Sequence, residues 1–354
     1  MKIYHLSHTD LDGYSAQIVT KNYFDDILFF NSNYGREIDE KFDEILLLIE
    51  KNKNINPSQK NLVLITDLNL NLLQCENFEN RLKALDSKIL LLDHHQSGLE
   101  CAKKFPWYFL DSSRCATLIT YDFFSEIFQD DNELKEYVKI VNSVDIWLKD
   151  ELWFEFGKVC MGIVSSAKEI NNVIFSDESR EYIFYLLSQA LKFWGQEDAH
   201  IKLDMEIHSI KKRFFMKDSD DTLSNLVSKY IVKQLSDNRE RFEISYFDKK
   251  GILTYNIGNT SVIGNDFLVQ NSDIDFFIDV TSRKTMSFRA NGNIDVSLMA
   301  KNLISGGGHK NASGGLFNSF KDAYSYDKIK SQIIELISKK TQKIEKEADN
   351  EIAK

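Results

Sequence analysis

The feature that most constrains the fold is an alternation of short apolar runs with longer helical patterns. Mostly apolar runs of strand length occur at 3–6, 27–30, 62–65 and 89–92, and helical patterns lie between them. Runs that are apolar throughout and separated by helices are typical of βαβ units, in which helices cover both faces of a parallel sheet. We therefore expect an α/β chain that begins with a parallel-sheet domain.

At 354 residues the chain is too long for a single hydrophobic core, so we expect two domains. Residues 181–241 are rich in charge and helical in pattern, which indicates a connection between the domains. A smaller α/β domain follows, with strands near 242–247, 252–255, 274–280 and 287–289, a turn at 249–251 and a helix at 295–303. The predicted organisation is a parallel-sheet domain at 1–180, a helical connection at 181–241, the smaller domain at 242–335, and a charged helical or disordered tail at 336–354.

The charge balance excludes one class of partner. The chain has 44 Lys and Arg against 54 Asp and Glu, a formal net charge of −10. A protein that binds long nucleic acid mainly through its phosphates needs a dense basic surface, whereas a small phosphorylated substrate needs only a few cations. The N-terminus lacks the apolar core of a signal peptide, and no apolar run approaches the length of a membrane span. The four scattered cysteines are interpreted as ordinary thiols of a cytoplasmic protein.

Acidic and histidine residues follow three of the apolar runs directly, at 7–13, 66–69 and 93–95. The carboxyl ends of parallel strands share one edge of a sheet, where open α/β sheets bind their ligands. Carboxylates gathered there repel one another unless cations lie among them. Oxygen and imidazole ligands without thiolates favour Mn²⁺ or Mg²⁺. The residues expected at this edge are His8, Asp10, Asp12, Asp67, Asp93, His94 and His95.

Other histidines have simpler interpretations. His200, Asp204 and His208 recur every four residues and share one face of a predicted helix. That stretch is charge-rich, so we interpret it as a solvated face rather than as a metal site. His5 lies within the first run and is expected in the core or at the sheet edge.

Several segments together resemble the DHH phosphoesterase superfamily. The segments SHTDLDG, TDLN, LLDHH and NSVDIW occur in the order of its four motifs, at 7–13, 66–69, 91–95 and 142–147. The segment SFRANGNIDVSLMAKNLISGGGHKNASGG, at 287–315, resembles the DHH-associated C-terminal domain. The layout, with NSNYG at 31–35, is most similar to bacterial nanoRNases that degrade short oligoribonucleotides.

The resemblance implies a hydrolase with two Mn²⁺ ions per active site, with Mg²⁺ or Co²⁺ as alternatives. It places His8 and Asp10 on one ion, Asp12, His94 and Asp145 on the other, and Asp67 between them. Two metals that share a carboxylate can activate one water for in-line attack on phosphorus. His95 would position the phosphate or protonate the leaving oxygen, and Asp93 would orient a neighbouring imidazole. Asp122 and Asp150 stay open as alternatives to Asp145, which could instead be a cap or surface charge.

The substrate site implied in the second domain is centred on Arg289 and on the glycine segment Gly306, Gly307, Gly308, His309 and Lys310. Glycines let backbone N–H groups approach a phosphate, and a helix starting after them would add partial positive charge. The alternative is a glycine that caps the 295–303 helix. Arg283 is interpreted as a surface residue, and Arg114 as a further candidate for phosphate contact at a helix start.

The predicted function is a Mn-dependent exonuclease or phosphodiesterase that converts short oligoribonucleotides to mononucleotides. A phosphomonoesterase acting on pAp, or a cyclic-nucleotide phosphodiesterase, could use the same centre. A nucleotide-binding regulator built on an inactive hydrolase is the non-enzymatic alternative. A pyrophosphatase and a RecJ-like processive nuclease are less favoured. The expected partners are short oligoribonucleotides or small nucleotides, with no long nucleic acid and no membrane, and a homodimer stays open.

Overall fold

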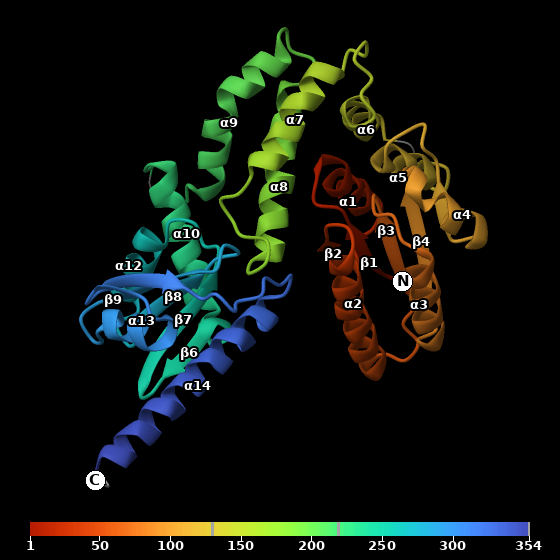
Figure 1. The fold of residues 1–354 in the computed structure, drawn as a ribbon. Coiled ribbons are helices and arrows are strands. Elements are labelled where there is room, and N and C mark those ends of the chain that lie inside the picture. Colours follow the sequence, from red (N-terminus) through yellow and green to blue (C-terminus); the bar gives the residue numbers. More distant parts are fainter. Residues whose placement is uncertain (129–130, 218–219, 353–354) are drawn as a thin grey trace. The chain divides into compact units, whose positions relative to one another are not determined.

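The computed structural model describes residues 1–128, 131–217 and 220–352, which separate into two compact units (Figure 1). Unit 1 comprises Met1–Ala167 and Arg180–Ile210, and unit 2 comprises Lys168–Ser179 and Lys211–Lys354. The predicted α/β class is confirmed, with a parallel sheet in unit 1 and a mixed sheet in unit 2. Residues 181–241, predicted as a connection, are divided between the two units.

Unit 1 is built on a five-stranded sheet in the order β2-β1-β3-β4-β5, with all strands parallel. The elements up to the unit boundary are β1 (Lys2–Ser7), α1 (Leu11–Tyr23), β2 (Ile27–Asn31), α2 (Arg36–Ile55), β3 (Asn61–Thr66), α3 (Leu72–Ala84), β4 (Lys88–Asp93), the 3₁₀ turn η1 (Gln96–Gly98), α4 (Leu99–Lys104), β5 (Tyr108–Leu110), α5 (Ala116–Ser125), α6 (Asn132–Asp145), α7 (Phe154–Ser166), α8 (Ser176–Ala190), η2 (Leu191–Phe193) and α9 (Ala199–Phe215). The short strand β5 has no counterpart among the predicted strands.

The strand order reverses between β1 and β3, because β2 lies on one side of β1 and the later strands lie on the other. In an open parallel sheet the loops at such a reversal leave in opposite directions, and ligands bind at the carboxyl ends there. The loops that follow β1 and β3 carry the first two predicted clusters, 7–13 and 66–69. The topology therefore places both clusters at the point where this sheet favours a ligand site.

The core of unit 1 follows from the alternation of side chains along its strands. Tyr4 and Leu6 of β1 point to one face, where they pack against α2 and α3 in a continuous apolar cluster. Phe42 of α2 and Phe78 of α3 stack there with ring centroids 3.6 Å apart. His5 points to the opposite face, fully buried, with Nε2 2.8 Å from Thr66 Oγ1. Burial lowers the pKa of His5 to about 3, so His5 is a neutral core residue.

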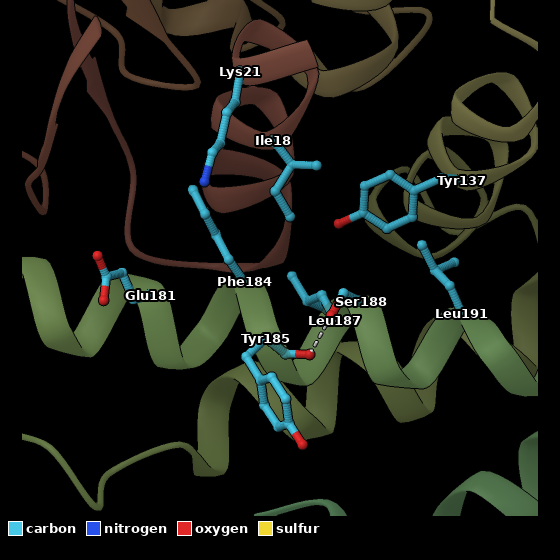
Figure 2. Close-up of a pocket in the computed structure, with 9 residues that line it drawn as sticks. All are labelled: Ile18, Lys21, Tyr137, Glu181, Phe184, Tyr185, Leu187, Ser188 and Leu191. Carbon is cyan, nitrogen blue, oxygen red and sulfur yellow. Dashed lines mark hydrogen bonds between the residues drawn. The ribbon is translucent and has the colours of Figure 1, made fainter. Parts of the chain in front are cut away.

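Helices α1, α6 and α8 border an apolar pocket of about 430 Å³ within unit 1 (Figure 2). Ile18, Tyr137, Phe184 and Leu187 line it, with Lys21 and Glu181 among its polar groups. Tyr137 also connects two of these helices, because its hydroxyl lies 2.5 Å from Ser15 Oγ of α1. None of the described residues that line this pocket belongs to the predicted site.

Unit 2 is built on a six-stranded mixed sheet in the order β10-β11-β9-β8-β7-β6, in which β7 and β8 are parallel and the other pairs antiparallel. Unit 2 contains the first residues of α8 and the last residues of α9. Its other elements are α10 (Leu223–Asp237), α11 (Arg239–Phe242), β6 (Glu243–Tyr246), β7 (Lys249–Tyr255), α12 (Thr260–Gln270), β8 (Phe276–Val280), β9 (Thr285–Ala290), α13 (Val296–Ile304), β10 (Gly307–His309), β11 (Ala312–Leu316) and α14 (Tyr326–Ile352). The predicted strands and the helix near 295–303 are all present.

The predicted hairpin turn at 249–251 is wrong by two residues. Tyr246 pairs with Lys249 across β6 and β7, so the turn is Phe247-Asp248, with Phe247 at φ 52°. Gly251 lies inside β7, beside Phe276 of the neighbouring strand. A Cβ at this position would lie 2.1 Å from the Phe276 ring. The glycine is therefore needed for close packing between strands and not for chain reversal.

The prediction of a helix after the glycine segment is also wrong. Residues Gly307–His309 form the edge strand β10, which pairs with β11. Ser305, at φ 56°, provides the left-handed cap of α13, so the glycine-cap alternative does not hold either. A Cβ on Gly306 would lie 2.4 Å from the Gly314 carbonyl oxygen, and one on Gly308 would lie 2.7 Å from that of Ala312. These glycines permit close approach of the two strands.

The C-terminal tail forms the end of α14 as far as Ile352, which agrees with the helical alternative predicted for 336–354 over the described part. The four cysteines are free and buried. A search of the described residues finds no helix with the length and apolar character needed to cross a membrane.

Candidate functional site

The loop after β1 carries His8 and Asp10 to the carboxyl edge of the parallel sheet. Asp10 is the N-cap of α1, where its Oδ1 accepts a hydrogen bond from the Gly13 amide at 3.0 Å. Gly13 permits this tight turn, since a Cβ there would lie 2.3 Å from the His8 carbonyl oxygen. His8 Nδ1 lies 2.9 Å from Asp10 Oδ2. The loop therefore presents an imidazole and a carboxylate side by side.

Asp12 lies in the first turn of α1 and is almost fully buried. Its two carboxylate oxygens accept hydrogen bonds from the amides of Ala116 and Thr117, both at 2.8 Å. These amides belong to the first turn of α5, where backbone N–H groups have no partner within the helix. The start of α5 therefore stabilises a buried negative charge on Asp12.

Asp67 follows β3 directly and adopts a left-handed conformation, with φ 55°. Its amide donates to the Leu92 carbonyl oxygen of β4 at 3.2 Å, which holds this conformation in place. The side chain is only 2% exposed. An aspartate adopts positive φ more readily than most residues, and strain of this kind clusters at functional sites.

The third cluster ends β4 and forms a hydrogen-bonded chain. Asp93 is buried and accepts a hydrogen bond from the Tyr108 hydroxyl at 2.7 Å. The other oxygen of Asp93 lies 2.7 Å from His95 Nδ1. A carboxylate accepts, so His95 donates from Nδ1 and directs Nε2 away from Asp93. Burial lowers the pKa of His95, but the bond to Asp93 outweighs it and raises that pKa.

These loops bring the predicted ligands together. Nitrogen and oxygen atoms of His8, Asp10 and Asp67 lie within 4.8 Å of one another, as do those of Asp12, His94 and Asp145. A third such group contains Asp67, His94 and His95, so that Asp67 and His94 each belong to two groups. From Nε2 of His94 the distances to Asp67 Oδ1, Asp145 Oδ2 and Asp12 Oδ2 are 3.3, 3.6 and 3.7 Å.

Asp145 is the last residue of α6, and its side chain is 21% exposed. Of the alternatives to it, Asp122 forms an ion pair with Arg114, and Asp150 is exposed. Neither belongs to a group of potential metal ligands among the described residues. The structure therefore brings Asp145, rather than its neighbours in sequence, to the carboxylate cluster.

The cluster contains more carboxylates than positively charged groups, so its aspartates repel one another. Burial and the nearby Asp12 raise the pKa of Asp67 well above its usual range. Burial, Asp12 and Asp67 together raise the pKa of Asp145 to about 9. Burial lowers the pKa of His8, but Asp10 and Asp67 outweigh it and raise that pKa to about 10. Protons therefore neutralise the cluster when no cation does so.

The donor set fits divalent cations. Among the described residues, the buried oxygens Asp67 Oδ2 and Asp145 Oδ2 accept no hydrogen bond. Buried carboxylate oxygens are almost always satisfied, so unsatisfied ones within a group of carboxylates and imidazoles indicate a missing positive partner. The cluster contains only oxygen and imidazole nitrogen atoms, which suits Mn²⁺ or Mg²⁺.

Arg114 lies two residues before α5 and is committed to carboxylates. Its Nε lies 2.7 Å from Asp111 Oδ2, and its Nη1 pairs with Asp122. The guanidinium lines a separate hollow of about 340 Å³ with Phe109 and Phe123. A phosphate at Arg114 would have to compete with two aspartates.

The remaining predicted residues lie in unit 2. Arg289 is on β9, where its Nη2 donates to Ser261 Oγ at 2.7 Å and its Nη1 to the Phe288 carbonyl oxygen at 2.8 Å. His309 and Lys310 are exposed, at the end of β10 and in the turn that follows it. Ala312 of β11 pairs with Arg289 and also with His309, so Arg289 and His309 lie two strands apart. Arg289 and His309 therefore belong to the same sheet of unit 2, and Lys310 lies in the turn beside them. Arg283 is exposed on the loop before β9, as predicted for a surface residue.

Tyr34 was not predicted as a site residue. Its hydroxyl lies 3.0 Å from His95 Nε2, and its ring centroid lies 4.5 Å from that of His8. The NSNYG segment that contains it runs from the last residue of β2 through the loop before α2, without charge or periodicity to indicate a chemical role. Only the folded sheet shows that this loop reaches the carboxylate cluster.

Comparisons with known proteins identify the family. No family model matches the chain. A 3',5'-cyclic-nucleotide phosphodiesterase from Helicobacter pylori is 42% identical over 349 residues, which cover 96% of this chain and 99% of that protein. The chain belongs to this phosphodiesterase family. A crystal structure of an uncharacterized protein from Helicobacter pylori G27 superimposes with a TM-score of 0.87 at 40% identity, over 96% of this chain and 99% of that one.

Membership of this phosphodiesterase family spans both units, because the matched region covers nearly the whole chain. It agrees with the broader part of the predicted resemblance, that of a phosphoester hydrolase. An exopolyphosphatase-related protein from Bacteroides fragilis aligns at 12% identity with a TM-score of 0.24, over 97% of this chain and 94% of that one. That likeness is too low for any structural argument.

Proposed function

We propose that the chain hydrolyses phosphodiester bonds in small nucleotides, as a DHH-type phosphoesterase that uses two divalent cations held at the carboxyl edge of unit 1. The observation that carries this proposal is that two groups of potential metal ligands, one containing Asp67 and the other His94, are linked by a third group that contains both residues. The unsatisfied oxygens of Asp67 and Asp145 and the phosphodiesterase relative support it. We propose Mn²⁺ as the ion, with Mg²⁺ and Co²⁺ as alternatives.

His8 and Asp10 would hold one cation, Asp12, His94 and Asp145 the other, and Asp67 would contact both. When bound, such a pair supplies Lewis acidity to the phosphate and to the attacking water. The residues of the chain itself arrange this centre. Asp12 is oriented by hydrogen bonds from the first amides of α5. Asp67 is oriented by the hydrogen bond that its backbone amide donates to β4.

His95 is proposed to give a proton to the leaving oxygen. Water adds to phosphorus and releases one proton to solvent, the bond from phosphorus to a ribose oxygen breaks, and that oxygen takes the proton from His95 Nε2. Asp93 accepts from Nδ1 at 2.7 Å and is held by Tyr108, which keeps Nε2 directed outward. A ribose alkoxide is a poor leaving group, so proton donation to it lowers the barrier.

Two substrate classes are supported by different observations. The relative is named for 3',5'-cyclic nucleotides, which makes a cyclic phosphodiester the first class to test. The motif resemblance favours short oligoribonucleotides cleaved to mononucleotides, with pAp as a further candidate. In either case we propose that Arg289, His309, Lys310 and the backbone of Gly306, Gly307 and Gly308 contribute phosphate or nucleotide contacts from unit 2.

A substrate panel tests the proposal. Protein loaded with Mn²⁺ is incubated with 3',5'-cyclic AMP, a diadenylate, pAp, and DNA and RNA of two to ten nucleotides, and the products are separated by chromatography. We expect hydrolysis of at least one phosphodiester and its loss after chelation. Tight nucleotide binding without hydrolysis, together with no bound metal on elemental analysis, would instead favour the non-catalytic regulator.

A further inference from the structure

The loop between β2 and α2 holds Tyr34 against the carboxylate cluster. Asn33, its neighbour, donates from its amide and its side chain to Glu37 Oε2, at 3.0 and 2.9 Å. Thr9, beside His8, donates to Asn33 Oδ1 at 2.9 Å. Gly35, at φ 83°, then lets the chain turn into α2. These bonds fix the backbone on the N-terminal side of Tyr34 and tie the loop to the His8 loop.

The Tyr34 side chain spans the two edges of the cluster. Its ring lies beside His8, with centroids 4.5 Å apart, and nearly edge-on to His95, with centroids 5.5 Å apart. Tyr34 is nevertheless 41% exposed, so it is not part of the hydrophobic core. An exposed aromatic residue held over a polar cluster is placed for contact with a ligand.

The Tyr34 hydroxyl lies next to His95 Nε2, the atom proposed to protonate the leaving oxygen. His95 Nδ1 is bound to Asp93, so Nε2 is the free end of the imidazole, and Tyr34 Oη lies 3.0 Å from it. An oxygen that receives a proton from Nε2 must come within hydrogen-bond distance of that atom. Two groups 3.0 Å apart can both reach one such oxygen.

We propose that Tyr34 is a catalytic residue whose hydroxyl donates a hydrogen bond to the leaving ribose oxygen beside His95. This inference rests on the proposed function and deepens it. As the bond from phosphorus to oxygen breaks, negative charge develops on that oxygen. His95 transfers its proton to this oxygen, while Tyr34 keeps its own proton and stabilises the charge through the hydrogen bond. The contact matters most where the leaving group is a poor one.

The test compares leaving groups in the Tyr34→Phe variant, which keeps the ring and removes only the hydroxyl. Each enzyme is loaded with Mn²⁺ and assayed on the best nucleotide phosphodiester of the panel and on thymidine 5'-(p-nitrophenyl phosphate). On the nucleotide, whose leaving group is an alkoxide, we expect kcat to fall about 10- to 100-fold. On the nitrophenyl ester, whose leaving group is stable without a donor, we expect a change below about threefold.

Matched variants identify the cause of any loss. Tyr324→Phe removes the hydroxyl of another exposed tyrosine, in unit 2, and should leave both activities unchanged. His95→Ala should show the same dependence on the leaving group, and the double variant should lose less than the product of the single effects. In protein with ¹⁵N-labelled histidine, Tyr34→Phe should shift the His95 Nε2 resonance in the absence of metal.

Equal losses on both substrates would show a purely structural role and overturn the assignment, as would full activity of Tyr34→Phe. An unchanged Nε2 resonance would contradict the contact itself. These outcomes concern Tyr34 alone as long as the wild-type protein cleaves phosphodiesters. If the metal-loaded wild type cleaves none, the proposed function fails first, and the role of Tyr34 fails with it.

Discussion

The two sheets carry their predicted functional residues in contrasting ways. In unit 1 the residues of the cluster follow the ends of parallel strands or, for Asp145, end α6, and they are mostly buried or half-buried and lie within a few ångströms of one another. In unit 2 Arg289 is bound to Ser261, while His309 and Lys310 are exposed on an edge strand and its turn. A cation site must bury charge and so leaves unsatisfied oxygens in the protein alone. A phosphate-binding surface stays solvated until its ligand arrives, so its geometry alone is less informative.

The largest effect expected from this contrast is at Asp67. Replacing it with asparagine removes the carboxylate that, among the described residues, belongs both to the group with His8 and Asp10 and to the group with His94 and His95. We expect hydrolysis to fall by about a thousandfold or more, and bound Mn²⁺ to fall from two ions per chain to one or none. Turnover and elemental analysis of the same preparation measure both quantities. Two bound ions and near-normal turnover in this variant would contradict the assignment of unit 1 as the cation site.

Proton release on metal binding should be the next largest effect. With pKa values of about 9 for Asp145 and about 10 for His8, both groups are protonated at pH 7 in the cation-free protein. A cation must displace these protons, so its affinity should fall as the pH is lowered from 9, by about tenfold per unit for each proton. Calorimetry in buffers of different ionisation enthalpy counts the protons released.

Asp145→Asn provides the control for that titration and has a separate effect on stability. The variant should release one proton fewer on binding metal, although its affinity is lower. A carboxyl whose folded-state pKa is raised stabilises the fold at low pH, and that contribution is lost progressively as the pH rises from the ordinary carboxyl range to about 9, so that little of it is left near pH 8. The cation-free variant should therefore unfold at a higher temperature than the wild type near pH 8. An unchanged melting temperature would argue against charge repulsion at the site.

A smaller and different effect is expected from Arg289→Gln in unit 2. If Arg289 contacts a substrate phosphate, KM should rise about tenfold, while kcat changes little and both metals stay bound. Arg283→Gln is the matched control, since Arg283 is exposed on the loop before β9. A fall in metal content would show that the two regions are not separable in this way. An unchanged KM would remove Arg289 from the proposed substrate site.

The smallest effect is expected at Arg114, despite its place in the same unit as the cluster. Its guanidinium is already paired with Asp111 and Asp122. Arg114→Gln should therefore change kcat and KM by less than about threefold and lower the melting temperature slightly. A large rise in KM would instead reveal a phosphate contact that forms by exchange with these aspartates.

Much of the fold was predictable because apolar runs and helical periodicity are local properties. The parallel sheet, and the position of acidic clusters after its strands, followed from the runs near 3–6, 62–65 and 89–92. The errors occurred where a local signal had two physical causes. Gly251 indicated a turn but serves the packing of Phe276, and the glycines after α13 indicated a helix start but allow two strands to approach.

The candidate site divides in the same way. The sequence by itself determined which carboxylates and imidazoles follow the strands, because each apolar run and the polar residues after it are neighbours along the chain. Only the tertiary structure decided that Asp145, rather than Asp122, completes a group of potential metal ligands, and that Arg114 is already paired. It also brought Tyr34 to His95, across 61 residues of sequence. Contacts of that kind depend on where separate loops meet in space, and no local pattern encodes such a meeting point.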